Sequence, residues 1–393
     1  MNSFVQYAPT EVVFGRGTED QTGAYVKKWG GNRVLIVFGE GSAVRSGLIA
    51  RVERSLEAEG IEYAECGGVH PNPLLSFAQA GAQQAAAFGA DLILAVGGGS
   101  AIDTAKAIAH GNAYPGVPLW DIWTGKVKLT RSTPVGVVLT IAAAGSEMSA
   151  SSVLTNEAIG KKSGLSSDFN RARFAIMDPE LTFTLPKYQL AAGITDIMMH
   201  TMERYFIPGI KAQLTDEISE GLLRTVIDNA RIVMRDQTDY DAMAEIMWCS
   251  SISHNNLTEA GRGRDFSVHK FGHALSAMFD VTHGASLSAI WGSWALYQYD
   301  GAIPQFARYA RSVWHIDEAD DTRAAIAGIE TTVAFFAEIG MPVNISQLMG
   351  RTLTQSEIDH LALDATMNGT VRLSRIHPLG LAEVKQIYSM ANV

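Results

Sequence analysis

The first half of the chain alternates between short buried strands and amphipathic helices, and this alternation constrains the fold more than any other feature. Residues 33–39, RVLIVFG, form a continuous apolar run typical of a buried strand. A helix is predicted over 48–60, where Leu48, Val52 and Leu56 recur every four residues. The same pattern then repeats, with strands over 61–66, 91–98 and 133–141 and helices over 74–90 and 100–111. Such alternation across short turns predicts a parallel sheet with helices on both faces.

The character of the sequence changes near residue 187. The strand-like runs end, and long amphipathic patterns such as 214–236 and 320–340 take over. Pro179 and Pro186 lie at the break. A chain of 393 residues is expected to hold two or three domains. We therefore predict an α/β domain over 1–186 and an all-α domain over 187–393.

Charge and composition narrow the classes of partner. The net charge is −10 and no basic stripe is present, which argues against a nucleic-acid binder. The longest apolar runs are interrupted by glycine and are too short to cross a bilayer. The first residues lack the basic and apolar regions of a signal peptide, and the two cysteines, Cys66 and Cys249, lie far apart. We expect a cytoplasmic protein that binds neither nucleic acid nor a membrane.

Three consecutive glycines, Gly97 to Gly99, stand between a predicted strand and the helix that follows it. Glycine lets backbone N–H groups approach an anion closely, and a helix N-terminus adds a favourable dipole. Ser100 can cap this helix, and Asp103 stands three residues later, as in a capping box. The segment is neither a G-x-G-x-x-G fingerprint nor a Walker A loop. It is either a pyrophosphate cradle or a tight turn without a ligand.

A second glycine-bearing turn follows the strand over 33–39. Ligands of doubly wound sheets lie at the carboxyl ends of the strands, so both turns could border one site. Gly39 leaves room for a 2′-phosphate and Arg45 could pair with it, whereas the carboxylate of Glu40 favours a free 2′-hydroxyl. Gly39, Glu40 and Ser42 are the candidate cofactor contacts here, and a plain surface turn is the alternative for Glu40.

An acid and four histidines form the candidate metal site. Asp196 and His200 stand four residues apart in an apolar helical pattern and therefore share one helix face. His269 and His273 have the same spacing, and His283 follows after a predicted turn. One carboxylate and three imidazoles suit Zn²⁺ or Fe²⁺. Spacing alone does not identify which three or four residues ligate, and histidines held in an apolar core are the alternative.

Several motifs, in order along nearly the whole chain, carry a family resemblance. They read PTEVVFGRG (9–17), VHPNP (69–73), GGGSAIDTAKAIA (97–109), AGSEMS (144–149), MDPELTFTLP (177–186), GITDIMMHTMERYF (193–206) and HALSAMFDVTHGASL (273–287). Together they resemble the iron-containing (group III) alcohol dehydrogenase family, in particular its butanol dehydrogenase and NADPH-dependent aldehyde reductase branch. The resemblance implies a Rossmann-like N-terminal domain, a helical C-terminal domain and an active site in the cleft between them.

The same resemblance implies roles for individual residues. The metal ligands it implies are Asp196, His200, His269 and His283, with His273 a non-ligand histidine near the nicotinamide and substrate. The cofactor contacts it implies are Gly97, Gly98, Gly99 and Ser100 for the pyrophosphate, with Asp103 and Thr140 beside them. It implies an enzyme that transfers hydride between NADP(H), with NAD(H) as the alternative, and a small primary alcohol or aldehyde. The metal it implies is iron or zinc. A homodimer is also expected, and the N-terminal segment 2–15 reads as a strand that could pair across the dimer axis.

The chain departs from the family pattern at two places. Alanines occupy 142–144, where the family often has Pro or Thr before the glycine of its GSE motif, so we expect a hydroxyl contact with the cofactor to be lost. Glu40 replaces a glycine of the YGGGS form of the other turn. Family members with an acid at the position of Gly39 prefer NAD, and the acid here is shifted by one residue. We therefore predict NADP.

Two further interpretations stay open at this stage. Glycerol dehydrogenases and dehydroquinate synthases have an architecture similar to the one implied here. The synthases also need basic residues to bind an acidic substrate. Arg262, Arg264 and Lys270 are candidates for that role or belong to a solvated loop. A non-catalytic nucleotide- and metal-binding protein is the second interpretation. Apolar residues near the histidines, Phe266 and Phe271 among them, either shape a substrate pocket or belong to the core.

Overall fold

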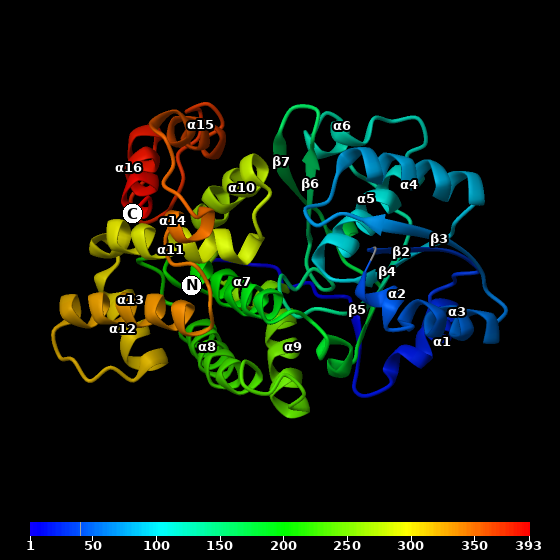
Figure 1. Ribbon diagram of the computed structural model, residues 1–393, viewed down its shortest axis with the longest axis horizontal. Helices are drawn as coiled ribbons and strands as arrows, with labels where there is room; N and C mark the ends of the chain where they lie inside the picture. The colour runs from blue at the N-terminus through cyan, green and yellow to red at the C-terminus, as the bar shows by residue number, and fades with distance from the viewer. Residues whose placement is uncertain (40) are drawn as a thin grey trace. The chain divides into compact units, whose positions relative to one another are not determined.

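The computed structural model describes residues 1–39 and 41–393, and the chain divides into two compact units (Figure 1). One unit is Tyr7–Leu185, and the other combines Pro186–Val393 with Met1–Gln6. The first six residues thus belong with the helical unit, whereas the sequence analysis assigns them to the α/β domain. There the backbone N–H of Asn2 donates to the carbonyl of Gly261 at 2.8 Å.

A six-stranded parallel sheet organises the α/β unit, in the order β1-β8-β5-β4-β2-β3. The strands are β1 (Glu11–Phe14), β2 (Arg33–Gly39), β3 (Glu62–Val69), β4 (Leu92–Gly97), β5 (Val135–Leu139) and β8 (Phe174–Met177). The predicted strands match β2, β3, β4 and β5. The predicted N-terminal strand over 2–15 is wrong for most of its length, because only β1 is extended in the sheet and residues 1–10 form no strand.

Helices cover both faces of this sheet, as the alternation predicts. Val34, Ile36 and Phe38 of β2 pack in one apolar cluster with α1 (Thr22–Lys28) and α3 (Leu48–Ala58). The intervening residues of β2 are also fully buried, so the strand has no solvent-facing side. Figure 1 shows α1 and α3 on one side of the sheet and α4, α5 and α6 on the other. The helices of this unit are α1 (Thr22–Lys28), α2 (Ser42–Arg45), α3 (Leu48–Ala58), α4 (Leu75–Phe88), α5 (Gly99–Ala113) and α6 (Leu119–Trp123), with 3-10 turns η1 (Thr18–Gln21), η2 (Asp168–Asn170) and η3 (Pro179–Thr182).

The strand order changes direction between β2 and β4. β2 pairs with β3 on one side and with β4 on the other. In open α/β sheets, ligands bind outside the carboxyl ends of the strands at such a switch point. Gly39 ends β2 and Gly97 ends β4, so both glycine-bearing turns of the sequence analysis lie at this edge.

An antiparallel hairpin, β6 (Ser151–Asn156) and β7 (Lys161–Ser166), lies apart from the sheet and is not predicted by the sequence analysis. It is attached to α5 through Asp103. The backbone N–H of Val153 donates to Asp103 Oδ2 at 2.8 Å, and Ser152 Oγ donates to the Asp103 carbonyl at 3.2 Å. The segment 140–150 is therefore held at one end by β5 and at the other end by the hairpin.

The second unit is helical and is built around α7 (Lys187–Tyr205), which packs against α8, α9 and α11. Every residue of α7 from Leu190 to Tyr205 is buried. The other helices are α8 (Gln213–Val233), α9 (Tyr240–His254), α10 (Ser267–Phe279), α11 (His283–Gln298), α12 (Ile303–Trp314), α13 (Asp321–Glu338), α14 (Ile345–Met349), α15 (Gln355–Ala365) and α16 (Leu381–Ala391), with η4 (Leu257–Glu259) and η5 (Tyr299–Gly301). Across the described residues, no helix combines the length and the hydropathy that a bilayer crossing needs.

The turn between β4 and α5 depends on the absence of a side chain at Gly98. A Cβ added there would lie 1.9 Å from Ile141 Cγ2. We expect Gly98→Ala to lower the free energy of unfolding by about 1–3 kcal/mol, as overpacking does, and Ile141→Ala to restore part of that loss. Thermal and urea unfolding measure both effects.

Gly164→Ala in β7 is the matched control, since its Cβ would lie 3.9 Å from Val153 Cγ2. Equal stability losses at the two glycines would show that Ile141 does not restrict the turn.

Candidate active site

The helix α7 buries charged side chains that a protein core does not ordinarily accept. Asp196, His200, Glu203 and Arg204 all lie in its fully buried stretch. Buried charges are normally paired with one another or bound to a metal. Arg204 has partners of its own, because its Nε pairs with Glu259 at 3.1 Å and its Nη1 donates to the His200 carbonyl. Asp196, His200 and Glu203 need other partners for their buried polar atoms.

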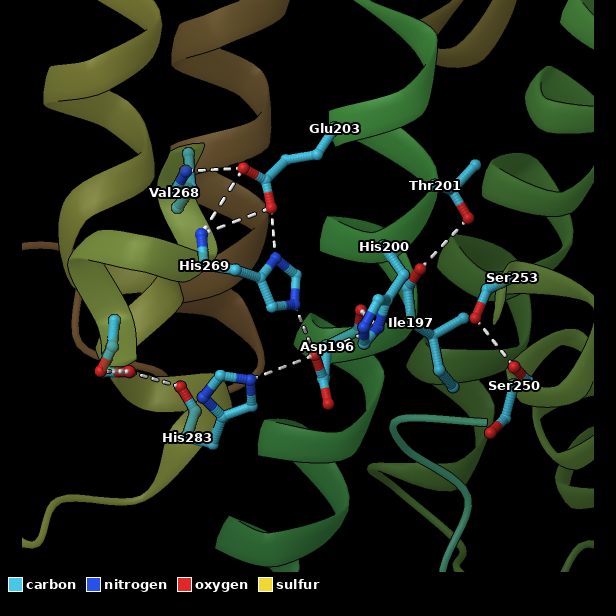
Figure 2. Close-up of polar contacts among 12 residues, drawn as sticks. Asp196, Ile197, His200, Thr201, Glu203, Ser250, Ser253, Val268, His269 and His283 are labelled. Carbon is cyan, nitrogen blue, oxygen red and sulfur yellow. Dashed lines mark hydrogen bonds and ion pairs between the residues drawn. The ribbon is translucent and has the colours of Figure 1, made fainter. Parts of the chain in front are cut away.

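Three of the four predicted metal ligands converge. One ligand atom from each of Asp196, His200 and His269 lies within 4.8 Å of the other two, and all three residues are buried. Asp196 Oδ1 is 3.2 Å from His200 Nδ1 and 3.5 Å from His269 Nε2. The fourth predicted ligand, His283, places Nε2 3.8 Å from the same carboxylate oxygen (Figure 2).

Two of these atoms lack the partner that burial requires. Among the described residues, Asp196 Oδ1 and His269 Nε2 make no hydrogen bond although both are buried. An unsatisfied buried donor or acceptor costs about 1–3 kcal/mol. A divalent cation between a carboxylate and imidazoles would satisfy both atoms, and this donor set suits Fe²⁺ or Zn²⁺. The residues present therefore fit a metal ion.

A close contact between two main chains positions His283. It is the first residue of α11, and the next residue is Gly284. A Cβ at Gly284 would lie 2.0 Å from the carbonyl oxygen of Ala192 on α7. Only glycine therefore permits α11 to begin this close to α7, one turn before Asp196 along that helix.

Two residues of this centre were missed by the sequence analysis. Glu203 contacts the Nδ1 atom of His269, and the ring of His254, at the end of α9, lies over the ring of His200 with centroids 4.0 Å apart. Glu203 has a detectable signal, since it follows Asp196 by seven residues and His200 by three and so shares their helix face. His254 has none, because nothing local distinguishes it from a core histidine.

Burial and charge shift the acid–base equilibria of this cluster. Burial, together with the neighbouring His254 and His269, lowers the pKa of His200 well below its usual value. Burial alone would lower the pKa of His269 as well, but the charges of Glu203 and Asp196 outweigh it and raise that pKa to about 9. Burial raises the pKa of Glu203, and His269 opposes this. The two carboxylates thus make the centre favourable for positive charge.

His273, predicted to be a non-ligand histidine, lies beside the cluster rather than inside it. It is half-buried, and its ring centroid is 5.3 Å from that of His283 and 6.2 Å from that of His269. This position, one turn further along α10 than His269, leaves part of the imidazole open to solvent.

In the α/β unit, the glycine loop lies at the start of α5, but its capping differs from the prediction. Gly98 is the N-cap, α5 begins at Gly99, and in the described chain no side chain caps this helix. The capping box of Ser100 and Asp103 is therefore wrong, because the helix begins before Ser100. The first-turn N–H groups are left for another acceptor, as an anion site requires.

Asp103 instead connects elements within the unit. Its Oδ1 accepts a hydrogen bond from Ser146 Oγ at 2.6 Å and its Oδ2 accepts from Val153. Beneath it, the fully buried Lys106 donates to Ser146 Oγ at 2.9 Å and to the carbonyls of Ser146 and Ser151, each at 2.7 Å. Burial raises the pKa of Asp103 and lowers the pKa of Lys106 to about 8. Contact of Asp103 with a cofactor stays a prediction.

The remaining predicted cofactor residues lie along the same edge of the sheet. Thr140 directly follows β5, and its N–H donates to the Gly97 carbonyl at 3.1 Å. Gly39 ends β2, and Ser42 begins α2 and is exposed. Glu40 lies outside the described residues. The exposed Arg45 folds back over this turn, since a Cβ at Gly41 would lie 3.2 Å from its Nη2.

Two alternatives of the sequence analysis are decided by burial. Arg262 is neither solvated nor available to an acidic substrate, because it is 1% exposed, pairs with Asp216 and donates to the Ile207 carbonyl at 2.7 Å. Phe271 belongs to the core, where its ring packs on Tyr388. Phe266 stays beside the centre, with its ring 5.0 Å from that of His269.

Comparison with known families agrees with this arrangement. The model of the iron-containing alcohol dehydrogenases matches residues 9–179, and the C-terminal model of the Fe-containing alcohol dehydrogenase family matches residues 190–392. The chain belongs to the iron-containing alcohol dehydrogenase family.

Individual relatives extend over the whole chain. It is 37% identical over 390 residues to NADH-dependent butanol dehydrogenase A of Clostridium acetobutylicum, with 99% of each chain covered. It is 32% identical over 397 residues to the NADPH-dependent aldehyde reductase YqhD of Escherichia coli, with 100% of each covered. The crystal structure of NADH-dependent butanol dehydrogenase A from Thermotoga maritima matches with a TM-score of 0.96 at 34% identity, covering 100% of this chain and 99% of that one.

Removal of the carboxylate at the centre should abolish stabilisation by metal. At a free Zn²⁺ concentration of about 100 times Kd, the free energy of unfolding of the wild type should rise by about 2.7 kcal/mol. Asp196→Ala should lose this gain, because Asp196 Oδ1 lies close to all three proposed imidazole ligands. Denaturant unfolding with and without Zn²⁺ measures the difference.

Asp300→Asn, which alters an exposed carboxylate paired with His377, is the control and should respond to Zn²⁺ as the wild type does. Equal stabilisation of Asp196→Ala would contradict the assignment of Asp196 as a ligand.

Proposed function

We propose that the protein is a metal-dependent alcohol dehydrogenase and aldehyde reductase that transfers hydride between NAD(P)(H) and a small primary alcohol or aldehyde. One observation supports this above the others: a buried carboxylate oxygen and a buried imidazole nitrogen face each other at 3.5 Å without hydrogen bonds among the described residues. Relatives along the entire chain include an NADH-dependent butanol dehydrogenase and an NADPH-dependent aldehyde reductase.

The chain's own residues would hold the metal and the cofactor. Asp196, His200, His269 and His283 are the proposed metal ligands. A divalent cation bound there supplies a Lewis acid that lowers the pKa of an alcohol or polarises an aldehyde carbonyl. Gly97 to Ser100 are proposed to bind the pyrophosphate at the start of α5, with Thr140 beside them. Fe²⁺ and Zn²⁺ both suit the ligand set.

We assign to His273 the transfer of the alcohol proton to solvent, directly or through a water molecule. Its half-buried ring beside His283 supports this role, because a proton relay needs contact with both the site and the solvent. An imidazole titrates near neutral pH and suits such a relay.

We propose NADP(H) as the preferred cofactor, with NAD(H) as the alternative. The exposed guanidinium of Arg45 lies over the turn after β2, where an adenosine 2′-phosphate would be recognised. Gly39, Ser42 and Glu40 are the other candidate contacts of that turn. We further propose a homodimer located in the cytoplasm, in agreement with two buried free thiols, Cys66 and Cys249.

The dehydroquinate synthase alternative has less support, because Arg262 already pairs with Asp216 and does not offer a free cation to an acidic substrate. A glycerol dehydrogenase differs in substrate alone, and a non-catalytic metal- and nucleotide-binding protein differs in having no turnover. An assay of cofactor oxidation distinguishes both of these alternatives from the proposed function.

The assay follows the absorbance of NADPH and of NADH separately with butanal as substrate. We expect butanal-dependent oxidation of both cofactors, faster with NADPH, lost after chelation and restored by Fe²⁺ or Zn²⁺. Faster oxidation of NADH would reverse the cofactor preference and keep the enzyme class. No oxidation of either cofactor by metal-loaded protein, with butanal or a panel of small aldehydes, would overturn the proposed function.

The role of His273 predicts a change in the pH dependence of the reaction. His273→Ala should lower kcat/KM by about 10²-fold and flatten the pH–rate profile near neutrality, since the proposed proton relay is removed. His360→Ala, at an exposed position on α15, is the control. A profile for His273→Ala with the same shape as the wild type would exclude the proton relay.

A further inference from the structure

We infer that Glu203 is a positioning residue of the metal site, whose carboxylate fixes the orientation and the tautomer of His269 so that Nε2 is available to a metal. The inference rests on the proposed metal site and assigns it a residue beyond the four proposed ligands. Its starting observation is that Glu203 is the third ionisable group on one face of α7, after Asp196 and His200.

The carboxylate of Glu203 is fully buried, and among the described residues its hydrogen bonds go to the start of α10. Oε1 accepts a hydrogen bond from the backbone N–H of Val268 at 2.5 Å, and Oε2 accepts from the backbone N–H of His269 at 3.3 Å. Oε2 also contacts the ring Nδ1 of His269. Figure 2 shows the imidazole between Glu203 on one side and Asp196 on the other.

These contacts determine which ring nitrogen carries the proton. Backbone N–H groups only donate, so both oxygens of Glu203 act as acceptors, and with Glu203 ionised the Nδ1 that contacts Oε2 is the donor in the ring. A neutral imidazole protonated at Nδ1 has its lone pair at Nε2. Nε2 is the nitrogen that lies 3.5 Å from Asp196 Oδ1. Metal-ligating histidines are held in this way by carboxylates elsewhere, and loss of such a partner weakens metal binding.

The carboxylate of Glu203 also has a structural role, which must be distinguished from its proposed role in orienting His269. α10 begins at Ser267, and its N-cap residue Phe266 has a left-handed backbone with φ 58° and provides no side-chain cap. The N–H groups of Val268 and His269 belong to the first turn, which has no intrahelical acceptors. Glu203 therefore caps α10 from another helix, and a negative charge at this end is also favoured by the helix dipole.

Glu203→Gln separates the two tasks, because a glutamine has one acceptor oxygen where the site requires two. If that oxygen accepts from Val268, the amide NH₂ faces Nδ1 and favours the opposite tautomer. We expect this variant to keep the folded structure and to bind Zn²⁺ about 10- to 100-fold more weakly, measured by competition with a chromophoric chelator. Glu203→Ala should lose stability in addition.

Glu259→Gln is the matched control, since Glu259 pairs with the buried Arg204 of the same helix. It should alter the thermal midpoint and leave the Zn²⁺ affinity of the folded protein unchanged. Unchanged Zn²⁺ affinity in folded Glu203→Gln would overturn the inference and leave only the capping role. An equal loss of affinity in both variants would also overturn it, because the effect would then reflect general destabilisation.

A measurement on the wild type tests the proposed tautomer of His269 even if the variants do not fold. In protein labelled with ¹⁵N at histidine and loaded with Zn²⁺, we expect the His269 ring to carry its proton on Nδ1. A proton on Nε2, with the metal on Nδ1, would overturn the inference. If the wild type binds no Zn²⁺ at all, the proposed metal site itself is wrong. If the wild type and Glu203→Gln bind Zn²⁺ equally well, the metal site stands and only the inference about Glu203 is wrong.

Discussion

The helical unit depends on the burial of charge on α7. A helix whose residues from Leu190 to Tyr205 are all buried would ordinarily be apolar on every side. Here it contains Asp196, His200 and Glu203 on one face, and the surrounding helices supply histidines rather than aliphatic side chains against that face. The energetic cost of burying these groups is offset when a cation occupies the space between them, so folding of this unit and metal binding are linked equilibria.

The α/β unit presents its candidate ligand-binding surface by leaving side chains out. Glycines end β2 and β4, and the first turn of α5 has no side-chain cap in the described chain. The neighbouring segment 140–150 is fixed from below by the buried ammonium of Lys106 and by Asp103. Because these buried hydrogen bonds already fix the backbone beside the uncapped N-terminus of α5, the site is preorganised. Binding of an anion would then require little further ordering of the chain.

Local patterns in the sequence predicted the local structure well and the long-range contacts poorly. β2 and α3 match their predicted ranges because β-branched runs and four-residue periodicity act within one element. β1 and β8 are four residues long, too short for any period, and they pair over a separation of more than 150 residues.

The candidate site shows the same division. The pairs Asp196–His200 and His269–His273 are visible as helix spacing, but their meeting, and the contact of Glu203 with His269 across 66 residues, are tertiary events. Arg262 was misjudged for the same reason: its burial depends on Asp216, 46 residues away, whereas arginine is mostly exposed in proteins. Capping by Ser100 was mispredicted because Gly98 is the N-cap and the helix begins two residues earlier than that prediction requires.

The approach of α11 to α7 has a consequence for which ions the centre can accommodate. The contact between Gly284 and the Ala192 carbonyl is between main chains, which cannot change rotamer to make room. The backbone of His283 is therefore already at its limit of approach to α7. Ions of different radius must be accommodated by rotation of the imidazoles and by α10, whose position depends on side-chain hydrogen bonds. For the proposed metal, size selection at this centre would thus be directional, rigid on the α11 side and adjustable on the α10 side.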